Sequence, residues 1–330
     1  MSDMSKGDEW MIRRLSFTCI IIISIFLLLG CNQEKNEQQI KGVGLLVPKT
    51  VNDQVWGTVG YKGMLDLQSK FNVKVYYKES VQTESQVEHA IEEFEKKGVN
   101  LIFGHGDSYS YFFNEVADKY PSIHFVSFNG NAKKENVTNF SFKSYAMGFF
   151  GGMVAGHMTK TNKVGIIAAF DWQPEVMGFA DGVRYENPQA DVQIKFVHHW
   201  DDVDLALTFF NELLIEDIDV FYPAGDLYNV PIIEKVKEHG LYAIGYVSDQ
   251  SYLGEQTVLT STVQHVDKLY ELAAKKFNEG TLSSGNIYVD FQDDVISLGK
   301  FSSQVDKPFQ KKINQLVNRY KKTGKLPNEN

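Results

Sequence analysis

Short apolar runs alternate with longer segments of mixed polarity over most of the chain. Runs that end at Pro, Gly or polar turn residues are typical of buried strands, and apolar residues gathered on one face of a helical repeat are typical of amphipathic helices. In the second predicted helix, Thr83 is in the N-cap position and Gly98 ends the helix. The first series consists of strands at 43–47, 73–77, 101–103, 123–128 and 137–142 and helices at 54–70, 83–97, 109–120 and 146–160.

A second series of the same kind begins at residue 164. Strands that alternate with helices predict parallel sheets built from βαβ units, and two series predict two doubly wound lobes. The regular part has strands at 164–168, 192–197, 220–222 and 241–245 and helices at 174–185, 204–215 and 230–239. After it we expect a crossing segment at 258–261, a helix at 266–278, a hairpin of 287–291 with 295–298, and a terminal helix at 306–322.

The helix at 146–160 is rich in small residues. Small side chains let two backbones approach closely, so we predict that this helix packs tightly against another element. Its small residues are Gly148, Gly151, Gly152, Ala155 and Gly156.

Most of the unusual polar and aromatic residues fall in loops at one end of the predicted strands. In open parallel sheets, ligands bind beyond the carboxyl ends of the strands. The loops there are 48–55, 104–108, 128–131, 169–173, 198–202, 224–229 and 246–250. The aromatic residues in or next to them are Trp56, Phe170, Trp172, Trp200 and Tyr228. Aromatic planes with a few convergent polar groups suit a flat or partly apolar small ligand; the alternative is that some of them only fill the interface between the lobes.

The chain begins with the features of a secretory leader. Arg13 and Arg14 precede an apolar run at 15–29, and Gly30 then stands directly before Cys31. This arrangement resembles a bacterial lipobox, in which the chain is cut before the cysteine and a lipid is joined to its sulfur. The alternative is an uncleaved membrane helix, but such a span needs about 20 apolar residues. We therefore expect a signal peptide at 1–30, lipidation of Cys31, and a polar tether at 31–39; Met11 is a candidate start.

Composition places the chain among globular proteins and limits its partners. The net charge is −9 for 330 residues, which argues against direct nucleic-acid binding because that rests on Lys and Arg. The one basic stretch, at 311–325, fits the solvated face of a helix better than a DNA-reading helix. The only cysteines are Cys19 and Cys31, so we expect no disulfide and no thiolate site in the mature domain.

Catalytic and metal motifs are weak or missing. Gly104-His105-Gly106-Asp107 resembles part of a phosphate-binding loop, but a tight turn at the cleft explains it better. His198 and His199 belong to a stretch with the residue types of a metal site, yet adjacent residues of a strand point to opposite sides. The chain has no HExxH, GxSxG or GxxxxGK[ST]. We predict neither an enzyme nor a bound cofactor or metal.

Several short motifs resemble one known family in order and spacing. They are Asn52-Asp53, Gly-Gly-Met-Val-Ala at 151–155, Lys-Val-Gly-Ile at 163–166, Asp249-Gln250 and Val-Leu-Thr-Ser at 258–261. Together they are similar to the basic membrane lipoprotein (BMP) family, substrate-binding lipoproteins of ABC importers typified by purine-nucleoside binders. The resemblance implies the type I periplasmic-binding-protein fold, an α/β architecture of two Rossmann-like lobes with a cleft and three crossings.

The resemblance also suggests limits for the lobes. We expect lobe 1 to comprise 40–144 and 255–284, together with the helix at 145–161, and lobe 2 to comprise 162–254 and 285–330. The crossings are then expected near 142–145, 246–257 and 283–285.

A closer resemblance concerns function. Segments at 61–63, 76–79, 146–153, 172–176, 199–202 and 222–226 are most similar to lipoproteins of bacilli described as positive regulators of competence. This implies a membrane-anchored, extracytoplasmic regulator of competence gene expression; the alternative is the substrate-binding component of a nucleoside ABC importer. The implied partners are a small ligand such as a nucleoside or other aromatic solute, the membrane through the lipid on Cys31, and an ABC permease.

The expected ligand-binding residues combine the loop analysis with the resemblance. They are Asn52, Asp53, Trp56, Gly104, Asp107, Asn129, Trp172, Trp200, Asp226, Asn229, Asp249 and Gln264. Where the resemblance implies two carboxylates and a lysine for a nucleoside binder, this chain has Asn129, Val247 and Gln264. Because each such charge-assisted bond is worth about 1.5–3 kcal/mol, we expect a changed or weakened specificity for nucleosides.

Overall fold

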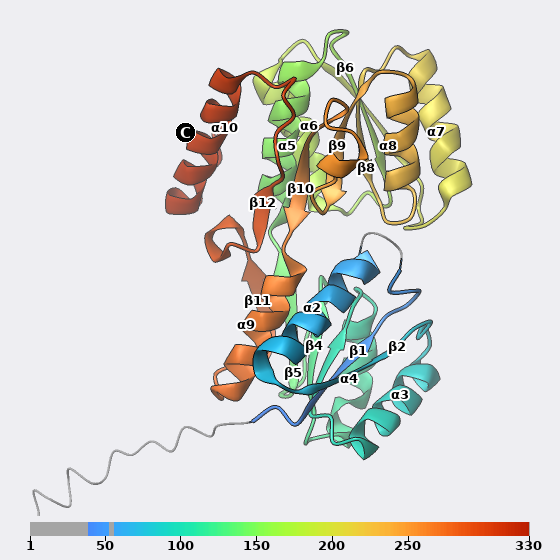
Figure 1. Cartoon of the computed structure of the whole chain (residues 1–330), viewed down its shortest axis with the longest axis vertical. Coiled ribbons are helices and arrows are strands. Elements are labelled where there is room, and N and C mark those ends of the chain that lie inside the picture. The colour runs from blue at the N-terminus through green and yellow to red at the C-terminus, as the bar shows by residue number, and fades with distance from the viewer. Residues whose placement is uncertain (1–38, 53–55, 330) are drawn as a thin grey trace, which may run out of the picture.

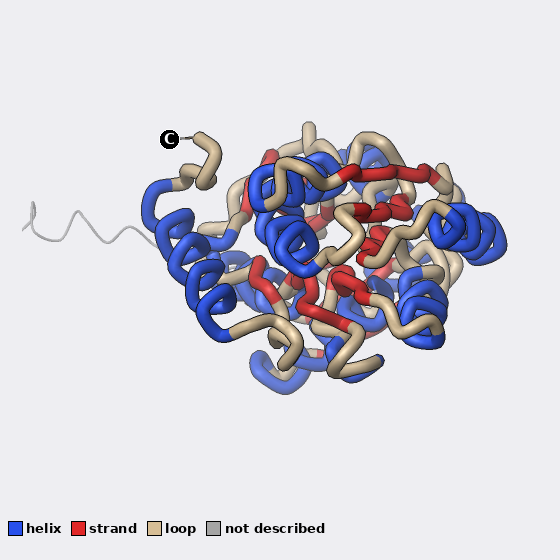
Figure 2. Tube along the Cα trace, turned by 90° about the horizontal axis from the view of Figure 1, so that it is seen from above, coloured by secondary structure: helices blue, strands red, loops and turns tan. Residues whose placement is uncertain are grey.

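A computed structural model describes residues 39–52 and 56–329, which form two α/β lobes, one above the other in Figure 1. The expected leader, the lipidation position Cys31 and the site residue Asp53 lie outside the described residues. Each lobe has a six-stranded sheet, and Figure 2, which looks down on the second lobe, shows helices on both sides of the strands. The predicted fold class is therefore confirmed.

The first lobe is built on a fully parallel sheet with the strand order β11-β5-β4-β3-β1-β2. Its strands are β1 (Gly42–Leu46), β2 (Lys74–Lys78), β3 (Leu101–Gly104), β4 (His124–Phe128), β5 (Val137–Phe142) and β11 (Gly285–Val289). Its helices are α2 (Trp56–Phe71), α3 (Glu84–Lys96), α4 (Tyr109–Val116) and α9 (Val266–Asn278). The Thr83 side chain accepts a hydrogen bond from the backbone of Gln86, whose own side chain accepts from the Thr83 backbone, so the predicted cap of α3 is a capping box.

The second lobe has the strand order β12-β10-β9-β8-β6-β7, in which only β12 is antiparallel to its neighbour. Its strands are β6 (Lys163–Ala168), β7 (Asp191–Phe196), β8 (Val220–Ala224), β9 (Tyr242–Val247), β10 (Val258–Gln264) and β12 (Ile296–Leu298). Its helices are α5 (Ser144–Met158), α6 (Pro174–Glu186), α7 (Val203–Ile215), α8 (Asn229–Glu238) and α10 (Lys307–Thr323).

The sheets correct the expected lobe limits at two strands. Residues 258–261 were expected to form a crossing segment, within a stretch, 255–284, assigned to lobe 1. Residues 258–264 instead form β10, a buried strand of the second sheet. The polar side chains of β10 are satisfied within the lobe: Thr260 Oγ1 donates to Gly299 O over 3.0 Å and Thr262 Oγ1 donates to Gly245 O over 3.0 Å. Conversely, β11 was expected in lobe 2 and instead extends the first sheet beside β5.

The predicted hairpin of 287–291 with 295–298 is also wrong. β11 and β12 do not pair; they belong to different sheets, and the chain passes between the lobes through the short helix η3 (Phe291–Asp293). The three crossings therefore lie between β5 and α5, between β10 and α9, and between β11 and β12. Lys143 N donates to Val289 O over 2.8 Å and His265 N donates to Val295 O over 2.7 Å, so the crossings are hydrogen-bonded to one another.

The small-residue helix α5 packs along α6, which places it in the second lobe and not in lobe 1 as expected. A Cβ atom added to two of its glycines would collide with the α6 backbone. At Gly148 it would lie 2.0 Å from Glu175 O, and at Gly152 it would lie 2.0 Å from Phe179 O. The relation is reciprocal, because a Cβ at Gly182 of α6 would lie 2.0 Å from Phe149 O. The predicted close packing of this helix is confirmed.

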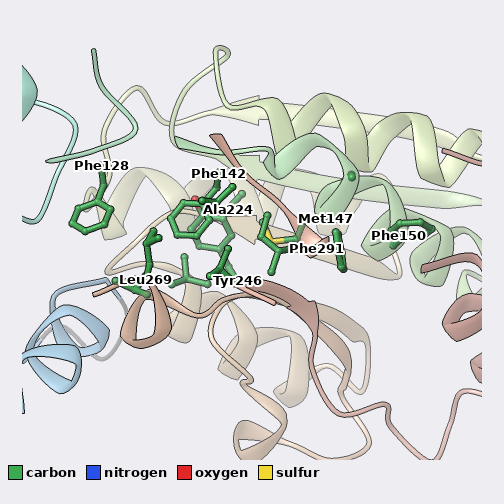
Figure 3. Close-up of a cluster of buried hydrophobic side chains, with 14 of the residues drawn as sticks. Phe128, Phe142, Met147, Phe150, Ala224, Tyr246, Leu269 and Phe291 are labelled. Carbon is green, nitrogen blue, oxygen red and sulfur yellow. The ribbon is translucent and has the colours of Figure 1, made fainter. Parts of the chain in front are cut away.

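One hydrophobic core cluster runs through both lobes. Figure 3 shows Phe128 and Leu269 of the first lobe together with Tyr246 and Ala224 of the second, and Met147 at the start of α5 among them. The crossings are thus embedded in packed side chains close to the cavity described next.

Candidate functional site

A cavity of about 310 Å³ lies between the lobes. It is lined from loops that follow β1, β3 and β4 of the first lobe and from loops that follow β6, β7, β8 and β9 of the second. These are the carboxyl ends of parallel strands, where open α/β sheets bind their ligands. A larger hollow of about 960 Å³ lies at the opposite end of the strands of the first sheet, next to Lys41, Asn100 and His124. Because that hollow faces the amino ends of the strands, we take the interlobe cavity as the candidate site.

The cavity brings together many of the residues expected from the sequence. Those that line it are Trp56, Asp107, Asn129, Trp172, Trp200, Asp226 and Gln264. Val247, the position of the second implied carboxylate, also lines it. The three positions at which this chain departs from the resemblance therefore share one cavity.

Other expected residues are described but do not line the cavity. Gly104 is a packing residue, since a Cβ there would lie 2.4 Å from Tyr109 Cβ. Asn229 is buried and holds the loop after β8: its amide donates to Asp226 O over 2.8 Å and its oxygen accepts from Gln250 Nε2 over 2.7 Å. The Asp249 carboxylate accepts from Lys300 N over 3.0 Å, and Asn52 is exposed at the edge of the described segment.

The first-lobe wall of the cavity is an aromatic stack on a buried histidine. The Trp56 ring lies 4.3 Å from the His105 ring with an angle of 12° between their planes. His105 Nε2 lies 2.6 Å from Trp56 O, and Nδ1 lies 3.0 Å from the Tyr270 hydroxyl. Because a carbonyl oxygen can only accept, Nε2 carries a proton and donates it to Trp56 O. The ring stacking and the hydrogen bond from His105 hold Trp56 in place. Position 60 has to be glycine, because a Cβ added there would lie 2.6 Å from His105 Nε2.

The second-lobe wall is a group of three aromatic side chains. Phe170 and Trp172 are stacked with centroids 5.3 Å apart, while Trp200 meets Phe170 at 5.3 Å and Trp172 at 5.7 Å, both edge to face. The Asp226 backbone N–H donates to Trp200 O over 2.9 Å and so ties the loops after β7 and β8 together. Trp172 lines the cavity and is 52% exposed.

A buried carboxylate, missed in the sequence analysis, lies where the cavity meets the crossing into α5. Glu175 is the second residue of α6 and accepts hydrogen bonds from Ser144 Oγ at 2.7 Å, Gln173 Nε2 at 3.1 Å and Tyr246 Oη at 3.1 Å. Burial, followed by the nearby Glu175 charge, raises the pKa of Tyr246 well above its usual value, so the phenol stays protonated and donates. The helix-start signature Gln173-Pro174-Glu175 could have indicated this site, because carboxylates are favoured in the first turn of a helix.

Two strand ends at the cavity adopt left-handed backbone conformations. Asn129 after β4 has φ 55° and Val247 at the end of β9 has φ 65°. Asn tolerates this region, but a β-branched residue is strained in it. Such strain concentrates at functional sites. It marks Val247 as a candidate functional position, which the residue type alone does not indicate.

An ion pair joins the two lobes beside the cavity, next in the chain to the lining residues Pro48 and Trp200. Lys49 Nζ of the first lobe lies 3.1 Å from Asp201 Oδ2 of the second, and His199 Nδ1 is paired with the other oxygen of Asp201. His199 thus serves as a partner of Asp201, and the described residues contain no group of three or more His, Cys, Asp or Glu side chains placed to hold a metal.

We predict that Lys49→Met shifts the protein towards a more open arrangement of the lobes. An exposed ion pair contributes up to about 1 kcal/mol, which corresponds to roughly a fivefold change in an equilibrium. Spin labels on the two lobes would report the distance distribution. Lys300→Met is the matched control, because it removes the ion pair between Lys300 Nζ and Glu255 Oε1 (2.8 Å) within the second lobe. An unchanged distribution for Lys49→Met would contradict the prediction.

Among residues 39–52 and 56–329, no helix is long and apolar enough to cross a membrane.

Comparison with known proteins supports a solute-binding architecture. A family model described as Bmp, ABC transporter substrate-binding protein PnrA-like, matches residues 40–330. The chain is 55% identical to the transcriptional activator protein med of Bacillus subtilis (strain 168), over 93% of this chain and 98% of that protein. It is similar, with a TM-score of 0.81 and 50% identity, to the crystal structure of a transcriptional activator of the comK gene from Bacillus halodurans, covering 86% and 99% of the two chains. A solute-binding protein of an ABC transporter system from Aeropyrum pernix shares the fold, with a TM-score of 0.71, 21% identity, and coverage of 87% and 81%.

Proposed function

Because the chain belongs to the Bmp family of PnrA-like ABC transporter substrate-binding proteins, we propose that it is a lipid-anchored, extracytoplasmic solute-binding protein that promotes expression of competence genes. One observation carries the regulatory part of this proposal: the chain is similar over 93% of its length to a protein of Bacillus subtilis that is named a transcriptional activator. A similar structure is described as an activator of comK. The retained interlobe cavity supports a sensor that responds to a small molecule.

The anchor is proposed from the leader. Gly30 and Cys31 follow an apolar run in the order of a lipobox. A lipid on Cys31 would hold the two lobes outside the cell on the tether at 31–39. The signal to the gene then has to pass through a membrane partner. The acidic net charge of −9 also speaks against direct contact with DNA.

A complementation experiment tests this function. In a Bacillus subtilis strain that lacks its med gene, this chain is expected to restore activity of a comK-promoter reporter. Cys31→Ala is expected to release the protein from the membrane fraction and to abolish most of the reporter activity. Cys31→Ala protein that stays in the cytosol and remains fully active would contradict the anchored model and favour a DNA-binding activator.

The runner-up is a working component of a nucleoside ABC importer. The family description supports it, while Asn129, Val247 and Gln264 at the cavity favour the regulator. Uptake of labelled adenosine separates the two, because only an importer component requires a permease that transports the bound nucleoside. Loss of uptake on deletion of this gene, with an unchanged reporter, would favour the importer.

A further inference from the structure

The first lobe carries an excess of lysine at the end of its sheet that is remote from the interlobe cavity. The segments that lead from the preceding helix turn or loop into its six parallel strands are called here the basal face: 39–42, 68–74, 93–101, 116–124, 132–137 and 275–285. The lysines of the basal face are Lys41, Lys70, Lys74, Lys96, Lys97, Lys119, Lys133, Lys134, Lys275 and Lys276. Against these ten lysines stand five Asp or Glu residues, so the basal face has a net charge of +5 in a chain whose net charge is −9.

The fold alone does not account for this charge. Lysine is favoured at the C-terminal ends of helices, where it interacts with the helix dipole, and both sheets have helix ends at this edge. The corresponding segments of the second lobe are 155–163, 183–191, 212–220, 235–242 and 250–258. They carry five Lys or Arg and eight Asp or Glu, a net charge of −3. The basic excess therefore distinguishes the first lobe from the second, although both have the same architecture.

Most lysines of the basal face are available to an outside partner. Three of the ten are in ion pairs: Lys70 with Glu271, Lys119 with Glu88 and Lys134 with Asp118. Two of these partners, Glu271 and Glu88, lie outside the counted segments, and counting them as well leaves a net charge of +3. The structure gives the other seven lysines no ion pair with a described residue, and all seven except Lys276 are exposed.

The described chain begins on this same face. The Asn100 side chain donates through Nδ2 to Gln39 O over 3.0 Å and accepts through Oδ1 from Lys41 N over 2.8 Å. Ile40 N donates to Asn278 Oδ1 over 2.8 Å. These bonds fix the start of the chain against β3 and the end of α9. Figure 1 shows it at the end of the first lobe that lies away from the second lobe.

A lipid on Cys31 would hold the basal face close to the membrane. Cys31 precedes Gln39 by eight residues, and a chain of this length reaches at most about 29 Å. The negative potential of anionic lipids attracts basic residues and decays within about 8–10 Å of the surface. The rest of the chain is acidic and is repelled by the same potential. The field therefore favours one orientation, with the basal face towards the lipid.

We propose that the basal face of the first lobe docks on anionic phospholipid of the membrane that carries the anchor. This rests on the proposed lipid anchor at Cys31 and adds the orientation of the protein. In this orientation the carboxyl ends of the first-lobe strands, and with them the interlobe cavity, point away from the lipid. The contact orients an anchored protein and does not replace the lipid at physiological salt, so release of Cys31→Ala from the membrane fraction is still expected.

Vesicle co-sedimentation tests the contact without the anchor. The protein is the mature chain, residues 31–330 with Cys31→Ser, which keeps both lobes. Vesicles of phosphatidylcholine that contain about one-third phosphatidylglycerol are compared with phosphatidylcholine alone, at about 0.05 M salt where screening is weak. We expect binding to the anionic vesicles to be stronger by about tenfold or more, and to be lost at about 0.5 M salt. Equal binding to the two kinds of vesicle, or none to either, would overturn the proposal.

A triple variant locates the contact on the basal face. Lys41→Gln, Lys133→Gln and Lys275→Gln combined remove three exposed lysines that come from different segments of the face. Each lysine near an anionic surface strengthens binding by about fivefold. We therefore expect the triple variant to lose affinity for the anionic vesicles by about tenfold or more. A folded triple variant that binds as tightly as the parent would refute the docking face.

A second triple variant with the same change of charge is the control. Lys307→Gln, Lys311→Gln and Lys322→Gln remove three exposed lysines of α10 in the second lobe, and we expect the affinity to change by less than about twofold. Equal losses in both triple variants would show that net charge controls binding and would overturn the assignment. Membrane fractionation of Cys31→Ala decides the anchor separately, so failure of the vesicle test leaves the proposed function intact.

Discussion

Restoring three charges in the cleft, with Asn129→Asp, Val247→Asp and Gln264→Lys combined, is expected to raise the affinity for a purine nucleoside by about three orders of magnitude or more. Each charge-assisted hydrogen bond is worth about 1.5–3 kcal/mol, and each 1.4 kcal/mol is a factor of about ten. The three positions line one cavity, so the new groups can act on the same ligand.

The backbone favours two of these replacements. Asn129 Oδ1 accepts from Phe142 N over 3.3 Å, a bond that an aspartate oxygen can keep. Val247 has φ 65°, and Asp is better tolerated in this region than a β-branched residue. The replacement therefore relieves backbone strain, although it places a charge on a side chain that is 2% exposed.

Calorimetry with adenosine, guanosine and inosine measures the effect. The wild type is expected to bind each more weakly than micromolar, and the single variants are expected to recover part of the gain. Micromolar binding of any of the three by the wild type would remove the basis for a changed specificity.

The second large effect is on stability: Gly152→Ala is expected to lower the free energy of unfolding by about 1–3 kcal/mol. Alanine favours a helix over glycine by up to about 1 kcal/mol, so propensity alone predicts stabilisation. The packing reverses the sign, because the new Cβ would lie 2.0 Å from Phe179 O, a backbone atom that moves only if α5 and α6 separate.

Denaturant titrations of neighbouring variants isolate this cause. Gly151→Ala sits on the same helix, but its Cβ would meet the Thr262 side-chain methyl at 3.0 Å, which can give way. We expect it to be far less destabilising than Gly152→Ala, and we expect Gly182→Ala on α6 to behave like Gly152→Ala. Equal midpoints for Gly151→Ala and Gly152→Ala would show that the helix contact does not limit stability.

Signals that are local in sequence predicted local structure well. The Thr83 cap and the alternation of strands and helices are read over a few residues, and the structure confirms both. Part of strand β10 was predicted as a crossing segment, because its place in the second sheet depends on distant groups: Thr260 and Thr262 donate to Gly299 O and Gly245 O. The hairpin prediction was wrong because two apolar runs on either side of a turn can pair with each other or with strands more than 30 residues away, and the sequence does not show which.

The cavity residues also divide into those that local sequence predicts and those whose role depends on contacts with distant residues. Its aromatic residues could be named in advance, because they occupy loops at strand ends. The sequence Gln173-Pro174-Glu175 marks a carboxylate in the first turn of a helix, but the role of Glu175 at the cavity depends on Ser144 and Tyr246, which come from other elements.

By itself, the sequence determined the family, the two-lobe architecture and the end of the sheets at which a ligand is expected, because each rests on periodicity, loop position or short motifs along the chain. Only the tertiary structure decided which lobe α5, β10 and β11 join and which residues share the cavity. Those properties depend on groups that are far apart in sequence and are brought together by packing.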